Sequence, residues 1–121
     1  MKRLLVFLAV AVSGIAALPA DAVTDRLTFV QVTEKEYTLT LSRSSVRTGS
    51  VSLEVLNFGM DTHDLVIKST KVGAKPIRFK KLDPRAHAEK TMRLTPGRYA
   101  LWCSLSDHKA RGMRATLVVR K

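Results

Sequence analysis

The chain of 121 residues contains a single cysteine, Cys103. No disulfide can therefore form within the chain, and the role of this unpaired thiol needs another explanation. Three are available: a small apolar side chain buried in the core, a disulfide to another molecule, or a ligand to a metal ion. The cysteine taken alone does not choose among them.

Segments with the periodicity of a helix are also missing. After residue 22, glycine and proline divide the chain into short stretches in which apolar and polar residues alternate, and no segment of helical length has a period of 3.6 residues. The strands expected from this alternation are residues 27–33, 36–42, 50–57, 63–69, 88–94, 98–103 and 114–120, with one more short strand around residues 77–79. This pattern predicts an all-β sandwich or barrel.

The N-terminus has the composition of a secretory signal. Lys2 and Arg3 precede an apolar run over residues 4–17, and a small-x-small cleavage pattern ends at Ala22. The run is shorter than the ~20 apolar residues that span a bilayer, so no membrane insertion is expected after cleavage. We predict a signal peptide over residues 1–22, and one mature domain over residues 23–121 that is exported, for example to the periplasm.

Acidic residues are few, with 10 against 21 basic ones. The predicted mature domain keeps 19 basic and 9 acidic residues, a net charge of +10. Such a charge favours acidic partners. Nucleic acid is not expected as a partner, because the basic residues are spread over the whole domain, no nucleic-acid-binding signature is present and there is one tryptophan.

Alternation along the strands brings four side chains with metal-binding chemistry toward one end of the fold. Side chains two residues apart share a face of a strand. By this rule Cys103, at the end of one strand, and His63, at the start of another, lie on the apolar side, and so does Met113, just before a third. His108 lies in the loop between Cys103 and Met113. If these strands are neighbours, the four side chains meet.

Two imidazoles, a thiolate and a distant thioether form the donor set typical of copper sites in electron transfer. The soft sulfur atoms favour Cu(I), and the imidazoles also hold Cu(II). Zinc more often takes a closed set of cysteine and histidine without methionine. Cys–His nucleophilic catalysis is a further alternative, with Asp107 as the orienting group, but nothing else in the sequence supports it.

The sequence resembles the cupredoxins, a family of small blue-copper proteins, over essentially the whole mature chain. The similar segments are TGSVSLEVLNFG (48–59), HDLVI (63–67), PGRYALWC (96–103) and the stretch from His108 through GM (112–113) to TLVV (116–119). The resemblance implies a Greek-key β-sandwich of about eight strands. It also implies one type 1 copper ion bound by His63, Cys103, His108 and Met113, and an electron carrier rather than an enzyme.

Two features depart from the family pattern. Many members have asparagine after the first histidine ligand, where this chain has Asp64, which can also tie the ligand loops together. The ligand loop often contains proline, and residues 104–112 contain none. Outside the ligand set, Met60 and Met92 are interpreted as core-filling side chains, and His87 as a solvated residue in a polar turn. Trp102 is expected on the opposite side of its strand from Cys103.

The function that these observations predict is an exported, monomeric electron carrier that cycles between Cu(II) and Cu(I). Lys109, Arg111 and Arg114 flank the ligand loop, and a basic rim there would steer an acidic redox partner such as a cytochrome or an oxidase. The alternative is a copper chaperone or copper-resistance protein on the same fold, which hands over the metal instead of the electron. A metal-free β-sandwich would require the four-residue arrangement to be accidental.

Overall fold

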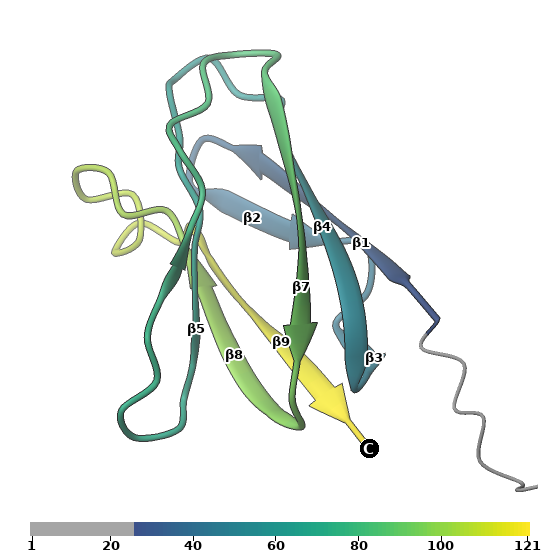
Figure 1. The fold of residues 1–121 in the computed structure, drawn as a ribbon. Coiled ribbons are helices and arrows are strands. Elements are labelled where there is room, and N and C mark those ends of the chain that lie inside the picture. The colour runs from purple at the N-terminus through teal and green to yellow at the C-terminus, as the bar shows by residue number, and fades with distance from the viewer. Residues whose placement is uncertain (1–25) are drawn as a thin grey trace, which may run out of the picture.

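A computed structural model describes residues 26–121 as nine β-strands (Figure 1). They are β1 (Thr28–Lys35), β2 (Thr38–Leu41), β3 (Ser45–Arg47), β4 (Gly49–Asn57), β5 (Val66–Ser69), β6 (Ile77–Arg78), β7 (His87–Leu94), β8 (Gly97–Trp102) and β9 (Arg114–Arg120). The predicted signal peptide, residues 1–22, lies outside the described residues. Within residues 26–121 there is no helix that could cross a membrane.

The strands form two sheets that face each other. One sheet has the order β2-β1-β4-β7 and the other the order β3-β9-β8-β5-β6. The pairs β1–β4 and β3–β9 are parallel, and the other pairs are antiparallel. The chain passes from one sheet to the other five times: between β2 and β3, β3 and β4, β4 and β5, β6 and β7, and β7 and β8. The prediction of an all-β sandwich is therefore confirmed.

The core lies between the sheets and follows the expected alternation. In β1, Val30 and Val32 are buried, whereas Phe29 points outward and is 63% exposed. Leu101 of β8 and Leu117 of β9 come from the opposite sheet and belong to the same buried cluster. The apolar area removed from water here is the main stabilising contribution, at roughly 25 cal/mol per Å².

Two strands differ from the sequence-based expectation. The three-residue strand β3 was not predicted, and it adds an edge to the second sheet by pairing with the end of β9. The strand expected over residues 63–69 begins in regular form only at Val66. The residues before it pair irregularly, because His63 forms an isolated bridge with Leu82 and the Phe79 amide donates to the Leu65 carbonyl at 2.8 Å.

The interpretations of four residues outside the ligand set can also be compared with the structure. Met60 is 84% exposed, so the prediction that it fills the core is wrong. Met92 is partly buried against the core, as expected. His87 is exposed as predicted, but it begins β7 instead of lying in a turn. Trp102 is half-buried, whereas its neighbour Cys103 is fully buried. This difference agrees with the expectation that the two side chains lie on opposite sides of the strand.

Candidate metal centre

Three of the predicted ligands converge on one point. The Nδ1 atoms of His63 and His108 are 3.2 Å apart, and the Cys103 sulfur is 4.0 Å from His63 Nδ1 and 3.6 Å from His108 Nδ1. His63 and Cys103 are fully buried, and His108 is half-buried at the surface. His63 precedes His108 by 45 residues and Cys103 by 40 residues in the sequence. The fold nevertheless brings the donor atoms of these three side chains together.

The distances between the three donor atoms are those expected if all three bind one metal ion. Metal–imidazole bonds are about 2.0 Å long and metal–thiolate bonds about 2.3 Å. With those lengths, the observed separations would give donor–metal–donor angles that add up to roughly 360°, a nearly planar triangle. A planar set leaves room for a weak axial donor. Trigonal His2Cys coordination of this kind favours copper over the closed tetrahedral arrangement of structural zinc.

The state of the Cys103 thiol is set mainly by its burial. Removal from water raises the pKa of Cys103 above its ordinary value, because the charged thiolate is poorly solvated in the core. The backbone amides of Asp64 and Leu105 act in the opposite direction on this pKa, and the negative charge of Asp64 adds a smaller increase. A bound metal ion reverses this balance, because coordination deprotonates a thiol outright.

The loop between Cys103 and Met113 is held by its own backbone, although it contains no proline. The His108 amide donates a hydrogen bond to the Leu105 carbonyl at 3.1 Å, and the Arg111 amide donates to the Asp107 carbonyl at 3.0 Å. Gly112 has a positive φ of 123°, and a Cβ there would lie 2.7 Å from the Tyr37 carbonyl oxygen. Glycine is therefore required at this close approach to the β1–β2 turn.

Met113 is joined to both loop ligands through the backbone. Its amide donates to the His108 carbonyl at 3.0 Å, and its carbonyl accepts from the Cys103 amide at 3.1 Å. The side chain is fully buried, as the alternation predicted. Met113 is thus fixed next to Cys103 and His108, and its role as an axial ligand stays a prediction.

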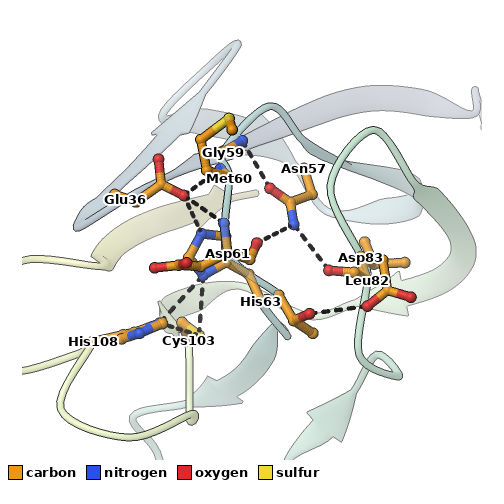
Figure 2. A network of polar contacts seen from close by, with 11 residues as sticks. Glu36, Asn57, Gly59, Met60, Asp61, His63, Leu82, Asp83, Cys103 and His108 are labelled. Carbon is orange, nitrogen blue, oxygen red and sulfur yellow. Dashed lines mark hydrogen bonds and ion pairs between the residues drawn. The ribbon is translucent and has the colours of Figure 1, made fainter.

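His63 is placed by a braced loop after β4. Asn57 is buried, and its side-chain amide donates to the carbonyls of Asp61 and Leu82 at 2.7 and 2.9 Å. Its carbonyl oxygen accepts from the Gly59 amide at 2.8 Å. The His63 amide then donates to the Leu82 carbonyl, and the Leu82 amide donates to the His63 carbonyl. Figure 2 shows Asn57 at the centre of this part of the network.

Asp64 joins the two halves of the site. Its carboxylate accepts from the Ser104 amide at 2.6 Å and from the Ser104 hydroxyl at 2.5 Å. Because Asp64 follows His63 and Ser104 follows Cys103, these bonds fix the distance between the two ligand segments. The prediction that an aspartate here can tie the ligand loops together is confirmed.

Two residues near the histidines were missed by the sequence analysis. The Tyr37 ring meets the His108 ring edge-on, with centroids 5.7 Å apart. A carboxylate oxygen of Glu36 lies 3.5 Å from His63 Nε2. Backbone amides, first that of Asp61, lower the pKa of Glu36 to about 2, so the group is ionised. Both residues lie in the turn between β1 and β2, and no local pattern marks them as neighbours of the site.

Comparison with solved structures identifies the fold. The structure matches auracyanin from the photosynthetic bacterium Roseiflexus castenholzii with a TM-score of 0.65 at 15% identity, covering 78% of this chain and 98% of that one. It matches auracyanin A, a "blue" copper protein of Chloroflexus aurantiacus, with a TM-score of 0.62 at 12% identity, covering 78% of this chain and 100% of the other. Rusticyanin from Thiobacillus ferrooxidans gives 0.63 at 13% identity, with 78% and 77% covered. The chain has the cupredoxin fold.

At the level of the fold, the resemblance seen in the sequence is therefore confirmed. No protein-family model matches the sequence, and no curated protein matches it. At one end of this cupredoxin fold the structure gathers two histidines and one cysteine, and one of the similar structures, auracyanin A, is a "blue" copper protein.

Proposed function

We propose that this protein is an exported blue-copper electron carrier with one type 1 copper ion bound by His63, Cys103, His108 and, as axial ligand, Met113. The observation that carries the proposal is the approach of two Nδ1 atoms and one sulfur atom to within 4.0 Å of one another, from two buried residues and one half-buried residue. Export and the monomeric state rest on the sequence. The carrier role does not require the chain to catalyse a net reaction.

Bound copper supplies a one-electron change between Cu(II) and Cu(I). The chain keeps the ligands where both oxidation states can use them, because rearrangement of ligands slows electron transfer. Asp64 and Asn57 restrain the segments of Cys103 and His63, and both act through hydrogen bonds that do not involve the ligand atoms. His108 is half-buried, so an electron has a short route from the site to the surface.

An acidic redox protein is the proposed partner. Lys109 stacks over the Trp102 ring at 4.2 Å and Arg111 over the Tyr37 ring at 3.4 Å, so both cations are held beside the ligand loop. A groove of about 400 Å³ begins at Lys109 and Trp102 and extends to Lys68 and Lys71, which add further positive charge along it. Lys109 and Arg111 thus lie beside the loop that carries His108, and they favour docking of a negatively charged face there.

Charge reversal at this rim is expected to slow docking. In a Lys109→Glu, Arg111→Glu double variant, association with an acidic cytochrome should become about 10-fold slower at low salt, because electrostatic steering is lost. Stopped-flow kinetics over a range of ionic strength will measure this, and the salt dependence should become weaker.

Arg47→Glu together with Arg120→Glu provides the charge-matched control. These two exposed residues pair at the end of β9 away from the ligand loop. If the control slows association as much as the rim variant does, net charge is responsible, and the proposed docking surface is wrong.

Titration with Cu(II) tests the metal site itself. One equivalent is expected to give an intense blue absorption and a matching electron paramagnetic resonance signal, and copper should stay bound through repeated reduction and reoxidation. His108→Ala should lose the blue species, because a ligand is removed. His87→Ala should not, because His87 is an exposed residue of β7.

Two results would contradict the carrier function. A colourless complex whose copper is still Cu(II) would show that no thiolate–Cu(II) site forms. Rapid reduction to bound Cu(I), followed by its ready transfer to an acceptor, would favour the copper chaperone.

A further inference from the structure

The His63 ring connects the candidate metal site to a carboxylate. Its Nδ1 atom faces His108 and Cys103, and its Nε2 atom, on the other side of the ring, lies 3.5 Å from a Glu36 oxygen. His63 is fully buried. Figure 2 shows Glu36 on one side of His63, with Cys103 and His108 on the other.

The chemistry of imidazole makes the second nitrogen important. A metal at Nδ1 uses the lone pair of that atom, so the ring proton must be on Nε2. His63 Nε2 is buried and has no hydrogen bond among the described residues. A buried N–H without an acceptor costs about 1–3 kcal/mol. The Glu36 carboxylate is the charged group that the structure places next to this nitrogen.

Glu36 is held in this position by other contacts. The same oxygen, Oε1, accepts from the amides of Met60 and Asp61 at 2.5 and 2.9 Å. The carboxylate is thus fixed to the loop that carries His63, and it does not depend on the histidine for its place.

Gly59 provides the space for the contact between Glu36 and His63. A Cβ at this position would overlap Glu36 Oε1 and would lie 3.0 Å from His63 Nε2. Any residue larger than glycine must therefore displace the carboxylate or the ring. The glycine, the two amide donors and the buried nitrogen together form a built site for a negative charge behind His63.

We propose that Glu36 is a positioning residue for the metal centre: its carboxylate fixes His63 as the Nε2–H tautomer and strengthens Nδ1 as a donor. Glu36 does not touch the metal. The part of this inference that concerns copper rests on the proposed function. A negative charge behind a ligand stabilises Cu(II) more than Cu(I), so Glu36 lowers the reduction potential.

Two variants separate the charge from the contact. Glu36→Gln removes the charge and keeps the shape, whereas Gly59→Ala keeps the charge and displaces the carboxylate. Each is expected to weaken Cu(II) binding about 10-fold relative to Cu(I), which corresponds to a rise of about 59 mV in the reduction potential. Competition with chelators for each oxidation state, and voltammetry, will measure the two quantities.

Asp61→Asn is the charge-matched control. Asp61 is an exposed residue of the same loop, and only its backbone contacts Glu36. Its substitution should change the potential little. Equal potentials for Glu36→Gln and Asp61→Asn would overturn the proposal, since an unspecific loss of negative charge would then account for both.

A measurement on the metal-free chain tests the inference without copper. Nitrogen-15 nuclear magnetic resonance of the wild type should show His63 as the Nε2–H tautomer, and Gly59→Ala should give a mixture of tautomers. A wild-type mixture, or identical spectra for both chains, would overturn the role of Glu36. If the tautomer is as expected but Cu(II) gives no blue species, the proposed function fails and the positioning of His63 stands. Thermal unfolding of each variant identifies any that does not fold.

Discussion

Replacing Cys103 by serine is expected to abolish the blue absorption of the copper-loaded chain and to weaken Cu(II) binding by more than about 100-fold. Loss of an outer hydrogen-bond partner of a metal ligand already costs roughly 10- to 100-fold in affinity, and a direct thiolate ligand should contribute more. The intense colour depends on the sulfur, so oxygen at the same position cannot restore it. Absorption spectra and competition titrations of both chains will measure the effect.

The substitution also affects folding, and a second variant separates the two effects. Cys103 is fully buried, so a serine hydroxyl without a partner there costs about 1–3 kcal/mol. Cys103→Ala avoids the buried hydroxyl and leaves a small cavity instead. Both variants should lose the colour, whereas their metal-free unfolding temperatures should differ. Retention of an intense blue band in either variant would exclude Cys103 as a ligand.

The positions of the ligands could be predicted because they depend on short-range patterns. The alternation in 98–103 and 63–69 placed Cys103 and His63 on the apolar side of their strands, and both are fully buried. The order of the sheets then brings β5 next to β8, and β8 next to β9. The loop from Cys103 to Met113 joins β8 to β9, so its ends were certain to be neighbours once that hairpin formed.

The surroundings of the ligands could not be predicted in the same way. Glu36 reaches His63 across 27 residues of sequence, from a turn that contains Tyr37 with a positive φ of 61°. Such contacts depend on how a turn in one sheet meets a loop that leads into the other. Met60 shows the opposite case: methionine is usually buried, but here the residue follows Gly59 on an exposed loop.

Glu34 was also missed, although its strand carries a signal. It is two residues after Val32 and four after Val30, so alternation along β1 directs it into the core. The side chain is fully buried, and neither carboxylate oxygen has a hydrogen bond among the described residues. Burial, followed by the negative charge of Asp64, raises the pKa of Glu34 from 4.5 to about 8. The folded chain therefore keeps this carboxyl protonated at neutral pH.

Glu34 should make the metal-free chain less stable as the pH rises from about 4.5 to about 8. In this window the folded state binds a proton that the unfolded state has released, so the free energy of unfolding falls as pH increases and its contribution levels off above the folded pKa. Each unit of difference between the folded and unfolded pKa corresponds to about 1.36 kcal/mol. The free energy of unfolding should therefore fall by up to about 5 kcal/mol in total. Urea unfolding of the chelator-treated protein at a series of pH values will measure it.

Glu34→Gln should remove this slope, because the amide stays neutral at every pH. The variant and the wild type are expected to be about equally stable near pH 4. Near pH 9, the variant should be more stable by most of the difference estimated above. Glu54→Gln is the matched control, since Glu54 lies on the neighbouring strand β4 and its carboxylate accepts a hydrogen bond from the Gln31 side chain. If the Glu34→Gln variant and the wild type show the same pH dependence, Glu34 is solvated in the folded chain. The prediction that its burial lowers stability at alkaline pH would then be wrong.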